Sequence, residues 1–415
     1  MRLLILGHNY APEELGIGPY TTGLAEHFKT QGHEVTVLTS FPHYPTYRWH
    51  DEPGLYRSEV RSGVVVRRIR LILPKRRSAF WRVVFDTSVG AGLLISSIGV
   101  SRPDLVLSVI PTLQTGMAGG ILAELWGVPL IVWIHDLPIE AALAVGMLRP
   151  GTLPKLGASF ERFVYRLASR IVVIGNRFRD NLMAKGIEGK RIAVIPDWIE
   201  AGETSTANPD PEMRRHLAGS ADKFVVLHTG AMAEKQGLGN VVEAARALAD
   251  DPTISTVLVG DGPTKEQLVA AKEQHGLTNL RILDVQPGKD YGRMLASADV
   301  LLLNQRRDVV EAVVPSKLLH YMAAGRPIIA AVNQASVAAE LILEAKSGVL
   351  VSPEDPDRLA DAIRNIRDNP DLRSRLGTNG REDAARNFAK PEIMERWDHL
   401  IADVVGSAGN PRPKS

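Results

Sequence analysis

The sequence of 415 residues contains no cysteine. Disulfide bonds and thiolate metal sites are therefore excluded, and the absence is compatible with a reducing compartment. An excess of charge of one sign is also missing, because 49 Lys and Arg residues face 47 Asp and Glu residues. This balance excludes a strongly basic or strongly acidic protein, so only the local distribution of charge can indicate a partner.

Long hydrophobic runs are missing as well. No apolar run reaches the roughly 18–20 residues of a membrane-spanning helix, and the nearest, 87–100, is shorter and follows Asp86. The apolar start, 1–7, is followed at once by His8, Asn9 and Tyr10. It is too short for a signal peptide and predicts a first strand. We therefore expect a cytoplasmic protein.

What the sequence does have is a series of short apolar segments alternating with helical spacing. Segments 3–6, 104–109 and 130–134 are apolar without polar alternation, which is typical of strands buried on both faces of a parallel sheet. The order predicts a doubly wound α/β domain. A polar segment, 199–212, then precedes a second such series, which begins at 224–228. Two successive domains imply a cleft where ligands bind.

A glycine-rich turn follows the first predicted strand. Gly16 and Gly18 open a helix there, and glycines permit close approach of a ligand while a helix N-terminus attracts anions. Position 21 is Thr, and the second strand ends in 38–40 without an acidic residue. A nicotinamide dinucleotide site is therefore disfavoured, and a plain tight turn is the alternative.

Two loops in the second half suit a diphosphate. Lys235 lies in the glycine-flanked loop 230–237 before a predicted helix, where a cation and amides can meet phosphate. A surface lysine is the alternative. Gly260 and Gly262 lie in a turn after a strand, where they permit a ligand to approach or simply form the turn.

The most specific segment is 314–327. Ser316 is a suitable N-cap, and Gly325 and Pro327 end the helix. We expect the amides of 316–318 and the side chain of Lys317 to form an anion site.

A histidine and an aspartate, His135 and Asp136, end the buried strand 130–134. Carboxyl ends of strands line the active crevice of open α/β sheets, so this pair suits the binding of sugar hydroxyls. A structural histidine is the alternative.

The segments 230–237, 258–263 and 315–327, in this order and spacing, resemble the retaining family-4 glycosyltransferases of the GT-B fold, and the similarity runs over essentially the whole chain. Segments 9–13, 16–20 and 33–37 resemble the bacterial exopolysaccharide and O-antigen branch, notably colanic-acid type fucosyl- and N-acetylfucosaminyl-transferases.

The resemblance implies a domain plan and a reaction. Residues 1–198 would form a Rossmann-like acceptor domain and residues 199–390 a nucleotide-sugar domain, with a final helix, about 391–408, crossing back and a tail at 409–415. The donor would be a UDP- or GDP-linked sugar, and the acceptor a saccharide or a polyprenyl-diphosphate-linked saccharide. Transfer would proceed with retention, and no metal and no cofactor are expected.

The resemblance also implies roles for single residues. His135 would contact the donor sugar near the reacting carbon, and Lys235 and Lys317 would neutralise the leaving diphosphate. Asp136 and Glu140 are the acceptor-side candidates. The expected donor-binding residues are Gly16, Gly18, Gly230, Gly260, Asp261, Gly262, Val285, Pro315, Ser316, Leu318 and His320.

The chain departs from the family pattern at two places. Ala231 stands where the family has an arginine, and His320 stands where it has a glutamate that would hold ribose. Two alternative hypotheses follow: a non-catalytic sugar-nucleotide-binding partner of a polysaccharide assembly complex, and a GT-B-fold sugar-nucleotide epimerase.

A basic and aromatic segment suggests a surface for anionic lipid at the inner face of the plasma membrane. A solvated basic face is the alternative, and nucleic acid is disfavoured because no fold for stacking single strands is recognisable. The expected patch comprises Arg67, Arg68, Arg70, Lys75, Arg76, Arg77, Trp81 and Arg82.

Overall fold

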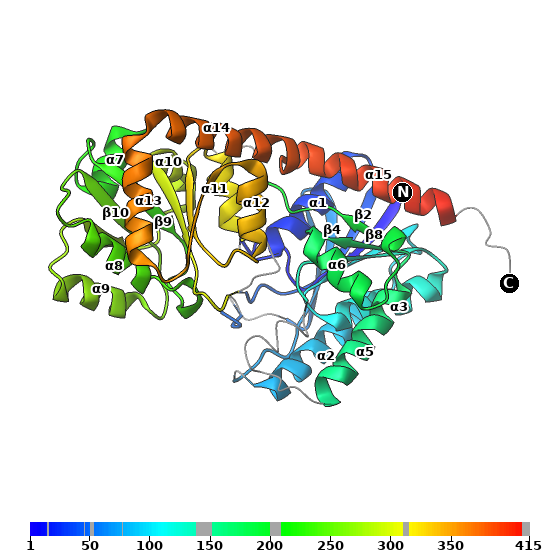
Figure 1. Cartoon of the computed structure of the whole chain (residues 1–415). Helices are drawn as coiled ribbons and strands as arrows, with labels where there is room; N and C mark the ends of the chain where they lie inside the picture. Colours follow the sequence, from blue (N-terminus) through cyan, green and yellow to red (C-terminus); the bar gives the residue numbers. More distant parts are fainter. Residues whose placement is uncertain are drawn as a thin grey trace. The chain divides into compact units, whose positions relative to one another are not determined.

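The computed structural model describes residues 1–14, 16–44, 46–49, 54–76, 78–137, 152–199, 209–309 and 315–408 (Figure 1). The chain divides into two compact units. Unit 1 comprises Met1–Asp197 together with the chain from Met394 onward, and unit 2 comprises Trp198–Ile393. The expected boundary between 198 and 199 lies one residue from this division.

Unit 1 is built on an eight-stranded sheet of order β3-β4-β2-β1-β5-β6-β7-β8. All neighbouring strands are parallel except β3 and β4, which form an antiparallel pair at the edge. The strands are β1 (Arg2–Leu6), β2 (Glu34–Ser40), β3 (Tyr56–Arg61), β4 (Val64–Ile69), β5 (Leu105–Ile110), β6 (Leu130–Ile134), β7 (Arg170–Val173) and β8 (Ile192–Val194). Strand β3 was not predicted, because its side chains are mostly exposed and polar.

Helices cover this sheet, and glycines bring one of them unusually close. A side chain at Gly119 would overlap with Ser108 of β5, and one at Gly116 would lie 2.6 Å from Val164 of α5. Helix α3 can therefore pack directly on both. The helices of unit 1 are α1 (Gly18–Thr30), α2 (Ala79–Ser96), α3 (Leu113–Trp126), α5 (Thr152–Leu167) and α6 (Asn176–Ala184), with a short 3₁₀ turn η1 (Gly189–Arg191).

Helix α2 is, within the described ranges, the one helix long and apolar enough to cross a membrane by length and composition. No such run was expected from the sequence, since the helix begins before the apolar segment and includes the ion pair between Arg82 and Asp86 (3.0 Å). The criterion is also met by core helices of soluble proteins, which are mostly buried, whereas only 28% of α2 is buried, including Phe85, Val89 and Leu93.

Unit 2 is built on a six-stranded, all-parallel sheet of order β11-β10-β9-β12-β13-β14. Val225 and Leu227 of β9 belong to one buried cluster, whereas Val226 belongs to another. Because alternate side chains point to opposite faces of a strand, both faces are covered, as predicted from the uninterrupted apolar strands. The strands are β9 (Phe224–Thr229), β10 (Ile254–Val259), β11 (Leu280–Leu283), β12 (Val300–Asn304), β13 (Ile328–Ala331) and β14 (Gly348–Val351).

Most helices of unit 2 lie between these strands in the sequence, whereas α7 precedes β9 and both α13 and α14 follow β14. Several begin at a side-chain cap, for example Ser336, which accepts a hydrogen bond from the amide of Ala339 at 3.2 Å. They are α7 (Pro211–Ala218), η2 (Glu234–Gln236), α8 (Gly239–Ala247), α9 (Lys265–Gln274), η3 (Gly288–Asp290), α10 (Tyr291–Ala296), α11 (Ser316–Ala323), α12 (Val337–Ala345), α13 (Pro356–Asp368) and α14 (Pro370–Asn387).

The last helix, α15 (Lys390–Ala408), begins in unit 2, and its residues from Met394 onward belong to unit 1. Its attachment to unit 1 is specific. Trp397 packs edge-on against Trp133 with ring centroids 4.9 Å apart, and Asp398 lies 2.9 Å from His27.

Candidate active site

Two glycine loops of unit 2 pack backbone against backbone. The amide of Gly230 donates to Val259 (2.9 Å), and that of Met232 donates to Asp261 (2.8 Å). A side chain on Gly260 would overlap with the carbonyl of Gly230, and the φ angles of Gly230 and Gly260 are 116° and 156°. Only glycine fits such positions. The glycines at 230, 260 and 262 therefore have a local structural reason, and their contact with a donor stays a prediction.

Lys317 lies against the first of these loops. It stands in the first turn of α11, and its Nζ lies 3.1 Å from the place where a side chain on Gly230 would begin. The same amine lies close enough to His228 of β9 for its charge, after burial, to hold the pKa of that imidazole well below the ordinary value of 6.5. Lys317 thus places a cation beside Gly230, next to Ala231, the position at which the family resemblance implies an arginine.

The N-terminus of α11 differs from the expectation in two details. Pro315 is the N-cap, and Ser316 is already the first helical residue. The amide of Leu318 donates to the carbonyl of Pro315 (2.8 Å). The side chain of Leu318 is fully buried in the core. The prediction that this amide would face a ligand was wrong, because the turn that begins the helix already uses it.

The other expected donor residues of unit 2 lie around these loops. The side chain of Lys235 is exposed on η2, and its carbonyl accepts the amide of Arg306 at 3.0 Å. His320 packs its ring edge-on against Tyr291 at 5.6 Å. Val285 and Asp261 are exposed to solvent.

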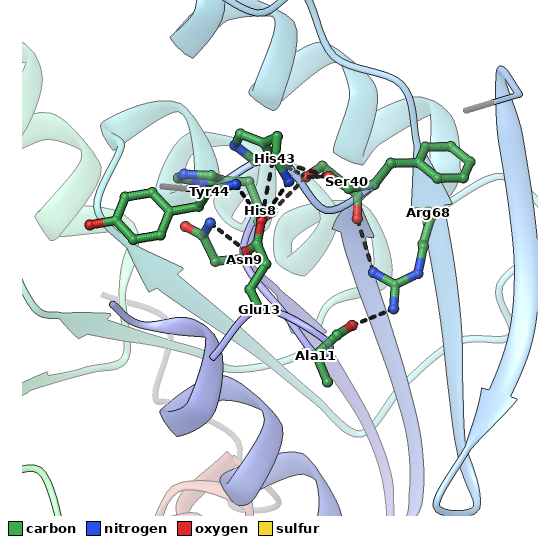
Figure 2. A network of polar contacts seen from close by, with 9 residues as sticks. His8, Asn9, Ala11, Glu13, Ser40, His43, Tyr44 and Arg68 are labelled. Carbon is green, nitrogen blue, oxygen red and sulfur yellow. Dashed lines mark hydrogen bonds and ion pairs between the residues drawn. The ribbon is translucent and has the colours of Figure 1, made fainter. Parts of the chain in front are cut away.

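In unit 1 a buried carboxylate ties together the loops that follow β1 and β2 (Figure 2). Glu13 accepts the backbone amides of His43 (2.7 Å) and Tyr44 (2.8 Å) with one oxygen and the side-chain amide of Asn9 (2.7 Å) with the other. It is only 5% exposed. Gly18 belongs to the same arrangement, since a side chain there would lie 2.9 Å from the carbonyl of Glu13.

Gly16 also has a local reason to be glycine. Its φ angle is 68°, and a side chain there would lie 3.0 Å from the ring of Tyr44.

A buried histidine, His8, lies beside this network. Burial lowers its pKa well below the ordinary value of 6.5, and the charges of His43 and Arg82 lower it further. Its ring contacts that of Phe85 edge-on, with centroids 5.5 Å apart. The imidazole is therefore neutral at physiological pH. The sequence had not singled out His8 as a site residue.

His135 follows β6 directly, as expected. Its side chain is 10% exposed, and its Nδ1 lies 3.4 Å from Oδ1 of Asp197. Its ring centroid is 4.2 Å from that of Trp133 and 6.0 Å from that of Tyr20. Asp136 is exposed and accepts the amide of Leu137 at 2.9 Å. Glu140 lies outside the described residues.

Sequence reasoning missed Asp197. It is far from His135 in the sequence, and no local pattern links the two. The one available signal is its position three residues after β8, the last strand of the first series.

The prediction of a basic surface patch was partly wrong. Arg67 donates to the carbonyls of Ser96, Ile98 and Gly99 at the end of α2. Arg68 is 3% exposed and bonds to Glu59, to Ser40 and to Ala11. Both arginines stabilise unit 1, because β4 directs them to groups within the domain.

The remaining members of the patch lie at or before the start of α2. Arg70, Lys75 and Arg76 are exposed, and the ammonium group of Lys75 lies 5.6 Å from the ring centroid of Trp81. Arg82 is paired with Asp86. Arg77 lies outside the described residues.

No three His, Asp or Glu side chains of the described residues gather closely enough to hold a metal ion.

Comparison with known proteins covers both units. "Glycosyl transferase 4-like domain" matches residues 16–198, and "Glycosyl transferases group 1" matches residues 209–383. The putative colanic acid biosynthesis glycosyl transferase WcaI of Escherichia coli strain K12 is 31% identical, over 98% of this chain and 100% of its own length. The probable glycosyltransferase WbjE of Pseudomonas aeruginosa is 25% identical, over 74% of this chain and 76% of its own.

A solved structure shows the same fold. Anabaena HepE in complex with UDP matches with a TM-score of 0.70 at 17% identity, covering 97% of this chain and 100% of that chain. The predicted fold class, α/β with the two Rossmann-like domains of the GT-B fold, is confirmed.

Proposed function

Because the chain belongs to the group 1 glycosyl transferases, whose relatives include the exopolysaccharide branch, we propose that it transfers a sugar from a nucleotide-diphosphate donor. The donor is UDP- or GDP-linked, and the acceptor is a glycan or lipid-linked saccharide of a bacterial surface polysaccharide. The name of the colanic acid biosynthesis relative supports the polysaccharide context, and the complex of HepE with UDP supports a nucleotide-linked donor.

The observation that carries the proposal is the position of Lys317. Its Nζ lies beside Gly230, at the start of α11 and at the carboxyl end of β9. Glycosyl transfer leaves negative charge on the departing diphosphate, and a preorganised cation at a helix N-terminus stabilises such charge. Lys235, exposed on the same loop, adds a second cation when the donor is bound.

The stereochemical course of the proposed reaction is retention without a metal. The donor phosphate itself accepts the proton of the incoming hydroxyl, and Lys317 supplies the positive charge. NMR of the product identifies the anomer, and an inverted anomer would refute retention. Activity that disappears in EDTA and returns with a divalent cation would refute metal independence.

A thermal-shift screen tests the donor site. Purified protein is combined with UDP, GDP, their sugar conjugates and NAD, with Lys317→Met and Lys235→Ala as variants. A ligand at about 100 times its dissociation constant adds about 2.7 kcal/mol of apparent stability. We expect stabilisation by UDP- or GDP-sugars that is lost in Lys317→Met. Stabilisation by NAD alone, or by no nucleotide, would contradict the proposal.

An activity assay with and without acceptor, run beside the thermal-shift screen, separates the two alternatives. A sugar-nucleotide-binding partner without catalysis gives stabilisation but no turnover, and an epimerase gives turnover without acceptor. A transferase requires acceptor for full turnover. Neither alternative is favoured by the relatives, which are described as glycosyltransferases.

We further propose that the protein is cytoplasmic and that the start of α2 docks it on the inner face of the plasma membrane. Phe80 and Val83 are 69% and 61% exposed on that helix, and Ile72 is 54% exposed just before it. The exposed cations Lys75 and Arg76 lie between them in the sequence. Apolar side chains with adjacent cations suit an anionic bilayer.

Vesicle binding tests this docking. With vesicles containing anionic lipid at low salt, we expect Lys75→Gln combined with Arg76→Gln to weaken binding, whereas Arg215→Gln on the surface of unit 2 leaves it unchanged. Equal binding by all variants would refute this surface.

A further inference from the structure

The imidazole of His135 is held on several sides. Trp133 lies 4.2 Å away between ring centroids, and the ring of Tyr20 is stacked at 6.0 Å with an interplanar angle of 28°. Asp197 faces the Nδ1 edge at 3.4 Å. With these three side chains around it, the ring is left with one edge that can meet a ligand, the edge of its other nitrogen.

That nitrogen, Nε2, is buried and has no hydrogen-bond partner among the described residues. Oδ1 of Asp197 likewise lacks a well-aligned hydrogen bond within the described residues. A buried polar atom without a partner destabilises the folded protein. Oδ1 of Asp197 faces Nδ1 of His135 at 3.4 Å, whereas Nε2 faces no partner among the described residues and points to a group that arrives with the ligand.

The carboxylate decides which nitrogen carries the proton. An acceptor at Nδ1 favours the tautomer with its proton on Nδ1, and Nε2 is then an acceptor. Asp197 is the last residue of unit 1 before the chain enters unit 2, and the amide of Ile195 holds this segment to Val173 of β7 at 2.9 Å. The carboxylate is therefore placed by the sheet of the same unit that carries His135.

We propose that Asp197 is a positioning residue, which holds His135 in the tautomer whose Nε2 accepts a hydrogen bond from a hydroxyl of the donor sugar. This inference rests on the proposed function. When the sugar binds, its hydroxyl satisfies Nε2, and the long contact between Nδ1 and Asp197 shortens, as hydrogen bonds of unliganded sites often do. Asp197 itself does not touch the sugar.

The first test needs no ligand. In protein labelled with ¹⁵N-histidine, the shifts of His135 report its tautomer, and its resonance is identified by its loss in His135→Gln. We expect the proton on Nδ1 in the natural protein and a changed tautomer population in Asp197→Ala, with Asp180→Asn, an exposed site on α6, as the control. A proton on Nε2 in the natural protein, or an unchanged equilibrium in Asp197→Ala, would overturn the proposal.

The second test separates sugar from nucleotide. The binding of UDP alone and of UDP-glucose, or of GDP and GDP-mannose if only guanine nucleotides bind, is measured for the natural protein and for Asp197→Ala. We expect the variant to lose about 10–100-fold in affinity for the sugar conjugate, the worth of a mispaired buried hydrogen bond, and to keep the affinity for the nucleotide.

Equal losses for both ligands would mean that Asp197 has only a structural role. No binding of any nucleotide by the natural protein would refute the proposed function, while the tautomer measurement would still decide the role of Asp197.

Discussion

The candidate donor site of unit 2 and the His135 region of unit 1 are built in different ways. In unit 2, neighbouring residues of two loops bond through their backbones, and one side chain, that of Lys317, adds charge. In unit 1, side chains that are distant in the sequence meet, as Asp197 meets His135 and Glu13 meets His43 and Tyr44. Substitutions in unit 1 should therefore act mainly on geometry and stability, and those in unit 2 mainly on the charge offered to a ligand.

The largest effect is expected at Arg68. Replacing this buried arginine with methionine leaves Glu59 and the carbonyls of Ser40 and Ala11 without their partner. Breaking a buried charged network costs about 3–5 kcal/mol, and urea denaturation measures it. The exposed neighbour Arg76 serves as control, since Arg76→Gln should change stability by less than about 0.5 kcal/mol. If both variants lose a similarly small amount of unfolding free energy, Arg68 does not stabilise unit 1 and would belong to the basic surface patch after all.

A somewhat smaller effect is expected in unit 2, where the substitution removes a positive charge from the candidate donor site. Lys317→Met keeps the shape of the side chain but removes its cation beside Gly230. The loss of one preorganised electrostatic contact lowers the rate about 10²–10³-fold, or about 2.7–4 kcal/mol. Steady-state kinetics with the donor found in the screen give the value.

Lys235→Gln is the matched variant for Lys317→Met. Its side chain is exposed, so we expect a smaller loss, about tenfold. A larger loss at Lys235 than at Lys317 would reverse the order of the two cations.

The same contrast explains what could be predicted from the sequence. Uninterrupted apolar segments such as Leu130–Ile134 indicate strands covered on both sides, and this strand was found where expected. The glycine loops and the start of α11 were visible because each is a run of consecutive residues. Strand β3 was missed because its exposed, polar residues carry no such pattern.

The features that could not be predicted from the sequence depend on tertiary contacts. Arg67 and Arg68 share a basic segment with Lys75 and Arg76, but β4 turns them toward carbonyls and Glu59, which composition cannot reveal. Asp197 is one acidic residue among many until the sheet places it at His135. The prediction for the amide of Leu318 failed because this amide already donates a hydrogen bond to the carbonyl of Pro315 and is not available to a ligand.

A third prediction concerns pH and involves one histidine in each unit. Burial holds the pKa of His8 and of His228 well below 6.5. The unfolded chain therefore binds more protons than the folded protein as pH falls below about 6.5, and stability is lost on acidification. The slope from each histidine grows as pH falls below 6.5, toward a limit of about 1.4 kcal/mol per pH unit for one proton.

Urea denaturation between pH 7 and pH 5 tests the contribution of each histidine. We expect His8→Gln and His228→Gln each to reduce the slope of the unfolding free energy against pH by the contribution of one histidine. His399→Gln should not, because this histidine is exposed. Unchanged slopes in both buried variants would show that other groups control acid sensitivity.

The smallest effect is expected from Ala231→Arg, which restores the cation that the family carries after this glycine. Ala231 is exposed, and an exposed ion pair contributes about 0.2–1 kcal/mol. In the natural background we therefore expect a gain in donor affinity of a few-fold at most, which fades at high salt because screening shortens the reach of exposed charges.

The informative background for Ala231→Arg is Lys317→Met. If Lys317 already occupies the electrostatic role of the missing arginine, the new arginine should restore more activity there than it adds to the natural protein, because substitutions that share one partner are not additive. Kinetics of the four proteins form a double-mutant cycle. An additive result would mean that positions 231 and 317 act on different parts of the donor. The charge of α11 would then be a separate feature of this chain and not a replacement.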